Sequence, residues 1–198
     1  MISSAPATRD APSLAEGLRR RRFPVADVVR MVELGLIQED ERLEVLDGEI
    51  VEMSPKGYRH EGLKGAINRL WGRHCPDGFD YMQETGLYLS EWTYLEPDFV
   101  VFPASVALRE LKGPDVLLAI EVADSSLDYD LGRKPGIYAS FGVQELWVID
   151  VPRRLTHVHR DPGEHGYSRI ERVPASSRLE PLHAPAALGF ALDDLGRS

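Results

Sequence analysis

Cysteine, long apolar runs and excess positive charge are all scarce in this sequence. Cys75 is the single cysteine among 198 residues, which excludes an intrachain disulfide framework and fits a reducing compartment. No apolar run approaches the roughly 20 residues that cross a bilayer, so no membrane span is expected. Residues 1–16 lack the apolar core of a signal peptide, so a cytoplasmic location is expected by default.

The acidic balance of the chain limits the partners that it can bind. A formal net charge of −9 argues against a broad surface that coats nucleic acid, although a local basic groove stays compatible with it. The length suits one domain with a sizeable core. Residues 1–22 are rich in Ala, Ser, Pro and charge, so we expect a disordered lead-in there and a single domain over 23–198.

Helical and strand-like patterns alternate along the rest of the chain. The spacing of apolar residues predicts helices over 23–35 and 60–71, and a further helix that ends near Ser140. An Asp-Gly pair between two strand-like runs is typical of a hairpin over 42–53. Residues 78–90 are expected to hold one or two strands, around 79–83 and 86–89. Further strands are expected over 98–102, 116–122, 143–150, 155–160 and 167–173, the last at the edge of a meander.

Two of these apolar strands each hold one carboxylate. Asp98 opens the run 98–102, and Glu121 lies inside 116–122, which is apolar enough for a strand covered on both faces. A lone carboxylate in such a strand is costly unless a partner pairs with it. Two carboxylates on successive strands can offset that cost together by holding a cation, so these strands carry the candidate site.

Hard divalent cations suit this pair of carboxylates. Mg²⁺ or Mn²⁺ uses one or two carboxylates with water and substrate phosphate, and the backbone carbonyl of Val122 is a candidate for a further oxygen. Such a metal polarises a phosphoryl oxygen and lowers the pKa of bound water. Phosphodiester hydrolysis also benefits from a cation near the phosphate. Lys134 is the candidate, because its segment is expected to pass back over the end of the Glu121 strand.

Several segments together resemble one known family. They are Pro97-Asp98, Glu121-Val122, the stretch 129–147 that ends in Gly-Val-Gln-Glu-Leu-Trp, the hairpin 42–49, Ser54-Pro55 and His60. This combination resembles the Uma family, bacterial "putative restriction endonucleases" within the PD-(D/E)XK nuclease superfamily. The resemblance extends over roughly 23–195.

The resemblance implies a fold, a cofactor and four site residues. The fold is restriction-endonuclease-like, α/β (α+β), with helices that flank a mixed central sheet, an N-terminal hairpin and C-terminal antiparallel strands. The implied metal ligands are Asp98 and Glu121, with a supporting acid at Glu44 and a catalytic lysine at Lys134. The superfamily usually places its lysine two residues after the glutamate, where this chain has Ala123, but the family resembled carries it on the following helix.

Each candidate also has a structural explanation. Asp98 after a proline is typical of a turn acid, and Glu121 could form a structural ion pair with an arginine or with Lys134. Lys134 could equally be a solvated charge, and Glu44 could be a surface residue of the hairpin. Pro135 directly follows Lys134, so the helix either starts late, with the proline in its first turn, or kinks there.

Neighbouring aromatic and histidine residues carry weaker signals. Tyr138, one turn beyond Lys134, is expected to pack in the core, and His60 to cap its helix or reach the cleft. His157 and His159 alternate along a strand, as on a basic edge that faces nucleic acid, although exposed-strand polarity explains them equally well.

Three function classes follow. The first is a Mg²⁺-dependent endonuclease that hydrolyses phosphodiester bonds of nucleic acid, with DNA as the favoured substrate. The alternative is a non-catalytic homodimeric binding or scaffold protein on the same fold, which the acidic charge, Ala123 and Pro135 favour. The third, a carboxylate-pair hydrolase acting on sugars, needs neither metal nor lysine and ranks below the others.

Overall fold

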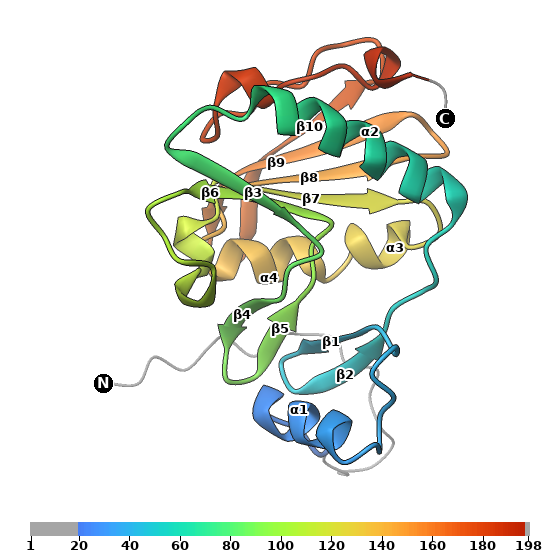
Figure 1. Cartoon of the computed structure of the whole chain (residues 1–198), viewed down its shortest axis with the longest axis vertical. Coiled ribbons are helices and arrows are strands. Elements are labelled where there is room, and N and C mark those ends of the chain that lie inside the picture. Colours follow the sequence, from blue (N-terminus) through green and yellow to red (C-terminus); the bar gives the residue numbers. More distant parts are fainter. Residues whose placement is uncertain (1–19, 197–198) are drawn as a thin grey trace. The chain divides into compact units, whose positions relative to one another are not determined.

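The structure, a computed structural model, describes residues 20–196 (Figure 1). These residues divide into two compact units. The first unit holds the described residues up to Met53 together with Leu89–Leu95. The second holds Ser54–Tyr88 and the described residues from Glu96 onward.

Residues 1–19, which make up most of the expected lead-in over 1–22, lie outside the described part of the chain. The expectation of a single domain over 23–198 stays a prediction. Among the described residues, no helix is both long and apolar enough to cross a membrane.

The first unit is built on a four-stranded sheet in the order β2-β1-β5-β4. The hairpin forms where it is expected, because Asp47 and Gly48 take the positive φ angles, 53° and 81°, that a two-residue turn needs. The three-residue strand β5 was not expected from the sequence. The elements are α1 (Val25–Glu33), β1 (Leu43–Leu46), β2 (Glu49–Glu52), β5 (Thr93–Leu95) and β4 (Leu87–Ser90), which enters from the second unit.

A six-stranded mixed sheet in the order β10-β9-β8-β7-β6-β3 forms the centre of the second unit. Only β7 and β8 are parallel among its neighbouring described strands. A parallel pair needs a crossover, and α3 (Leu127–Asp130) and α4 (Lys134–Ser140) supply it. The strands are β3 (Phe79–Gln83), β6 (Phe99–Pro103), β7 (Leu118–Ala123), β8 (Glu145–Asp150), β9 (Leu155–Gly163) and β10 (Gly166–Pro174).

Helix α2 (Tyr58–His74) covers one face of this sheet (Figure 1). Alternate residues of each strand point to the same face, so every second residue of β7 joins the core beneath the helix. Val122 and Val158 belong to this core and are 2% exposed. The core residues whose exposure rounds to zero are Ile67, Trp71, Phe99, Val101, Leu118, Ile120, Trp147, Ile149 and Leu188.

The C-terminal segment packs against the same core through two short 3₁₀ helices, η3 (Ala186–Leu188) and η4 (Leu192–Leu195). The Trp71 indole N–H donates a 2.8 Å hydrogen bond to the carbonyl oxygen of Leu188. That bond satisfies the only polar atom of a fully buried side chain and ties α2 to the C-terminal segment. Two other 3₁₀ helices, η1 (Leu108–Glu110) and η2 (Gly113–Asp115), lie between β6 and β7.

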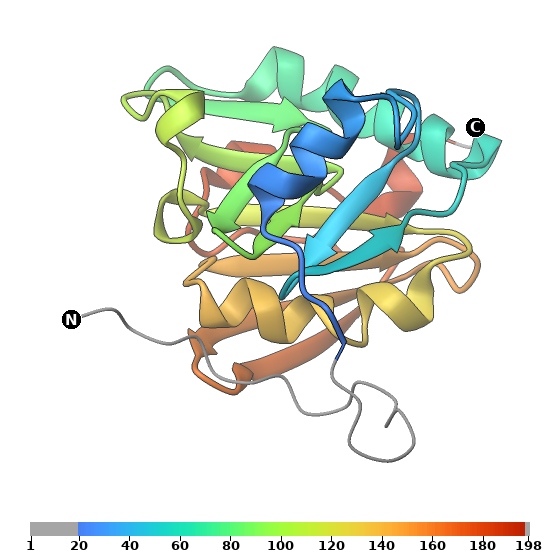
Figure 2. The same ribbon diagram turned by 90° about the horizontal axis from the view of Figure 1, so that it is seen from below.

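Helices α3 and α4 cover the opposite face of the sheet (Figures 1 and 2). Two short helices thus replace the single helix that was expected to end near Ser140. Pro135 lies in the first turn of α4, where its missing N–H would have no helical partner. Of the two alternatives for this proline, the late start of the helix is correct.

The predicted fold class is confirmed, and every expected strand forms with its start within two residues of the expected position. The hairpin β1–β2 holds the first two strands along the chain, as expected. The last two, β9 and β10, form an antiparallel pair with β10 at one edge of the six-stranded sheet, which was also expected.

Replacing Trp71 by alanine should lower the free energy of unfolding by about 3–5 kcal/mol, because the change leaves a cavity and removes the bond to Leu188. Urea unfolding measures the loss. Arg73→Ala, on an exposed position of the same helix, is the matched control and should change the free energy by about 0.5 kcal/mol at most. Equal stability of the parent and Trp71→Ala would contradict this account of the core.

Candidate active site

Asp98 and Glu121 meet across two neighbouring antiparallel strands. β6 pairs with β7 in a register that places Phe99 beside Ile120, and the backbone N–H of Val122 donates to Asp98, so Asp98, directly before β6, lies beside the Glu121–Val122 part of β7. The register therefore brings the two predicted carboxylates together at one end of the sheet.

Glu121 is buried against α4. Its Oε1 accepts hydrogen bonds from the Lys134 Nζ at 3.0 Å and from the Tyr138 hydroxyl at 2.6 Å. These two donors are four residues apart, so they lie on one face of the helix and reach the same strand. Lys134 is 1% exposed, and its Nζ also lies 3.3 Å from the Asp130 carboxylate. The alternative of a solvated Lys134 is therefore wrong, and Tyr138 makes a polar contact in addition to packing.

Asp98 is held by residues around the start of α2. Its Oδ1 lies 2.8 Å from the Lys56 Nζ, and its Oδ2 lies 3.0 Å from the His60 Nε2. The backbone N–H of Val122 donates a third hydrogen bond, of 2.8 Å, to Oδ2. His60 thus contacts the candidate carboxylate, as one of its two predicted roles requires.

Further charges surround this pair. Glu84 pairs with Lys56 and, at 2.7 Å, with Lys64, which also lies 3.2 Å from Glu61. These ion pairs join five carboxylates to three ammonium groups. The negative groups are Glu61, Glu84, Asp98, Glu121 and Asp130, and the positive groups are Lys56, Lys64 and Lys134.

The surrounding cations keep two of these carboxyls ionised. Burial alone would raise the pKa of Asp98, but the hydrogen bond and charge of His60 and the charge of Lys56 outweigh it and hold that pKa well below its usual range. Burial also acts to raise the pKa of Glu84, but hydrogen bonds from Lys56 and Lys64 lower it to about 2. Asp98 is therefore a carboxylate at neutral pH, as a ligand of a hard cation must be.

The donor set fits a hard cation. Within residues 20–196, no group of three or more His, Cys, Asp or Glu side chains is arranged to hold a metal ion. Mg²⁺, however, commonly takes one or two protein carboxylates and completes its shell with water and substrate phosphate. Asp98 and Glu121, which lie near each other where β6 begins and β7 ends, match that requirement.

Glu44 and Val122 are the two other predicted site residues, and their predicted roles are not tested by the contacts of the site. Glu44 belongs to β1 of the first unit, opposite Val51, and it is fully buried, so the alternative of a surface residue is wrong. Its role as a supporting acid stays a prediction. Val122 takes part through its N–H, which donates to Asp98, and the use of its carbonyl oxygen also stays a prediction.

The sequence reasoning missed five charged residues of the site, which are Lys56, Glu61, Lys64, Glu84 and Asp130. Lys56 precedes α2 and Glu84 follows β3, so neither lies in a periodic pattern that could mark it. Lys64 follows Glu61 by three residues on α2, a spacing that indicates a helical ion pair. That spacing carries no information on the burial of Lys64, which is 5% exposed.

His157 and His159 do not form a basic or exposed edge. Both imidazoles are buried in β9, at 8% and 4% exposure. Burial, followed by the charge of Arg172, lowers the pKa of His157, and burial lowers the pKa of His159 to about 4. His159 is therefore neutral at pH 7, and both explanations offered for this alternation are wrong.

The mixed sheet, its flanking helices and the order of its elements define a nuclease-like fold of the restriction-endonuclease type. A similar solved structure is a "putative nuclease belonging to DUF820 from Anabaena variabilis ATCC 29413". It is 16% identical, with a TM-score of 0.61, and the match covers 82% of this chain and 94% of that chain. At this identity the likeness shows the fold alone.

The family is shown by the sequence itself. Residues 26–193 match the family model Uma2, described as "Putative restriction endonuclease", so the chain belongs to the Uma2 family. The type IIG restriction endonuclease BpuSI matches over 60% of this chain and 14% of its own, at 16% identity and a TM-score of 0.39, which is too weak to carry an argument. No curated protein matches the chain.

The lowered pKa of Glu84 predicts a specific loss of stability in acid. A carboxyl with a depressed folded pKa stabilises the fold above its unfolded pKa, and this stability is lost as the pH falls through the folded value. The window for Glu84 runs from its ordinary 4.5 down to about 2. Because its side chain is 40% exposed, we expect its share to be about 1 kcal/mol or less.

Urea unfolding across this pH window tests the prediction. Glu84→Gln should show a shallower fall in unfolding free energy than the parent, with Glu110→Gln, on exposed η1, as the matched carboxylate control. The same pH dependence in Glu84→Gln and the parent would contradict the pairing of Glu84 with Lys56 and Lys64.

Proposed function

We propose that this protein is a metal-dependent endonuclease that hydrolyses phosphodiester bonds of nucleic acid, with DNA as its substrate. The observation that carries the proposal is a pair of buried carboxylates, Asp98 directly before β6 and Glu121 on β7. Glu121 also accepts a hydrogen bond from the buried Lys134. Membership of a family described as "Putative restriction endonuclease" supports the same chemistry. We further propose that the enzyme acts in the cytoplasm.

Asp98 and Glu121 would hold the cation, which we propose to be Mg²⁺ or Mn²⁺. When bound, Mg²⁺ supplies Lewis acidity toward a phosphoryl oxygen and lowers the pKa of water. The backbone carbonyl of Val122 and the carboxylate of Glu44 belong to the proposal as a further oxygen ligand and a supporting acid. Two carboxylates at one site favour a divalent cation over a monovalent one.

The lysine and tyrosine of α4 act on the same carboxylate. The Lys134 ammonium, 3.0 Å from Glu121, would place a positive charge beside the phosphate and stabilise the negative charge that develops there. The Tyr138 hydroxyl donates to the same Oε1 and so fixes the orientation of the Glu121 carboxylate. His60 and Lys56 do the same for Asp98.

The alternative, a homodimeric binding or scaffold protein on the same fold, rests on one observation. The ion pair of Glu121 with Lys134 is also what a purely structural carboxylate would form. A structural pair needs no second carboxylate nearby, whereas Asp98 accepts a hydrogen bond from the N–H of Val122, the residue after Glu121. We therefore rank the nuclease above the scaffold.

Cleavage of labelled DNA in Mg²⁺ or Mn²⁺ tests the proposal. Glu121→Gln keeps the shape of the side chain and removes its charge, so the cleavage rate should fall about 10²-fold or more. Tyr138→Phe removes one hydrogen bond to the carboxylate and should lower kcat about tenfold, with KM within about twofold. EDTA should abolish cleavage by the parent.

The matched control is Glu110→Gln, which removes one carboxylate from an exposed position and should cleave at the parent's rate. Full cleavage by Glu121→Gln, or parental cleavage in EDTA, would contradict the proposed mechanism. An intact parent that cleaves neither DNA nor RNA with either metal would favour the scaffold.

A further inference from the structure

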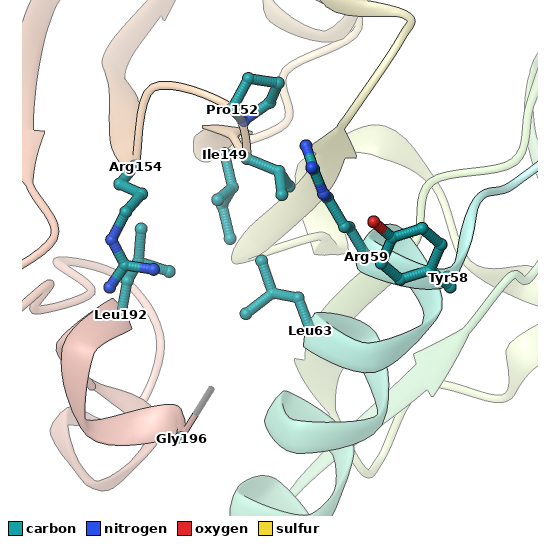
Figure 3. A pocket seen from close by; sticks show the side chains of 9 residues that line it. Tyr58, Arg59, Leu63, Ile149, Pro152, Arg154, Leu192 and Gly196 are labelled. Atoms are coloured by element: carbon teal, nitrogen blue, oxygen red, sulfur yellow. The ribbon is translucent and has the colours of Figure 1, made fainter. Parts of the chain in front are cut away.

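A pocket of about 420 Å³ opens on the α2 side of the sheet, near the end of β8 (Figure 3). Its lining comes from three parts of the second unit: the first turns of α2, the end of β8 with the β8–β9 turn, and the C-terminal segment. The residues are Tyr58, Arg59, Leu63, Ile149, Val151, Pro152, Arg154, Leu192 and Gly196.

The pocket combines an apolar interior with cationic groups at its sides. Figure 3 shows Leu63 and Ile149 between two arginines, Arg59 from α2 and Arg154 from the β8–β9 turn. This basic rim stands out on a chain whose net charge is −9. An apolar interior with a few charged groups suits a ligand with a planar apolar part and an anionic part.

Arg59 is the arginine available to an anion. Arg154 is paired with Asp193, but within residues 20–196 the Arg59 guanidinium has no carboxylate at ion-pair distance. Its charged carbon lies 5.8 Å from the ring centre of Tyr58, which is 78% exposed. A guanidinium and an exposed aromatic ring side by side present two flat surfaces, and nucleobases stack on both kinds.

Two segments of the chain connect the pocket to the candidate active site. Arg59 directly precedes His60, whose Nε2 lies 3.0 Å from Asp98. Val151, in the lining, donates its backbone N–H to the carbonyl of Ala123, two residues beyond Glu121. A ligand group in the pocket would therefore lie next to the strand ends that carry both carboxylates.

We propose that this pocket is a substrate subsite that receives one unpaired nucleotide of the strand being cleaved. Its base would contact Tyr58 and the apolar interior, and its phosphate would pair with Arg59. The inference rests on the proposed nuclease function and goes beyond it, because it adds a binding element that selects single-stranded or locally unpaired nucleic acid.

Fluorescence anisotropy with a labelled single-stranded oligodeoxynucleotide, in EDTA so that cleavage does not interfere, tests the subsite. Tyr58→Ala and Arg59→Ala should each weaken binding about tenfold, the loss expected for one stacked base or one lost phosphate contact. Arg59→Ala should also reduce the slope of log K against log salt by about one. Both positions are exposed, so neither change should impair folding.

Arg73→Ala is the matched control, because it removes the same charge from an exposed position at the other end of α2. It should change the affinity by less than about twofold. Equal losses in Arg59→Ala and Arg73→Ala would show general charge attraction and overturn the proposal. If free deoxynucleoside monophosphate competes as strongly as the strand, the pocket does not bind a nucleotide that is part of a strand. If a fully paired duplex binds as tightly as the single strand, the pocket does not select an unpaired nucleotide.

Failure of the subsite and failure of the nuclease give different results. Strand binding that depends on Tyr58 and Arg59 without any cleavage by the parent would keep the subsite and overturn the metal chemistry. Metal-dependent cleavage with a KM unchanged by Tyr58→Ala and Arg59→Ala would keep the nuclease and overturn the subsite.

Discussion

The ion pair between Glu121 and Lys134 is the contact on which the second unit depends. Burying a charge costs several kcal/mol unless a well-placed partner compensates it, and removing one partner of a buried pair costs about 3–5 kcal/mol. The parallel pairing of β7 with β8 requires a crossover on one face of the sheet. That crossover contains α4, which begins at Lys134 and brings both Lys134 and Tyr138 onto Glu121.

Stability alone does not explain the second carboxylate. Glu145 shows how this chain buries a structural carboxylate: it accepts hydrogen bonds from the Trp147 indole, the Arg160 guanidinium and the backbone N–H of Leu182. Around Asp98 and Glu121 the carboxylates instead share their cations: Lys134 contacts both Glu121 and Asp130, and Lys56 contacts both Asp98 and Glu84. Carboxylates that share their cations in this way suit a divalent cation, which supports our proposal that the site is functional.

Much of this fold could be predicted from local sequence patterns. The apolar run 116–122, the Asp-Gly turn and the helical spacing in α2 each act over a few residues, so the corresponding elements form where they were expected. The three-residue strand β5 carries too few residues for a pattern. The charged residues Lys56 and Glu84 could not be predicted, because Lys56 reaches Asp98 across 42 residues of sequence and Glu84 joins the site through its ion pair with Lys56. The pocket likewise joins three distant segments and leaves no local signal.

Calorimetric titration of Mn²⁺ tests the central claim, that Asp98 and Glu121 hold one cation together, without requiring knowledge of the substrate. A nonhydrolysable phosphorothioate oligonucleotide should be present, since Mg²⁺-type sites are completed by phosphate. The account predicts one Mn²⁺ per chain in the parent, and loss of that binding in Asp98→Asn and in Glu121→Gln, with no further loss when both changes are combined. Binding that survives either single change would contradict the shared site.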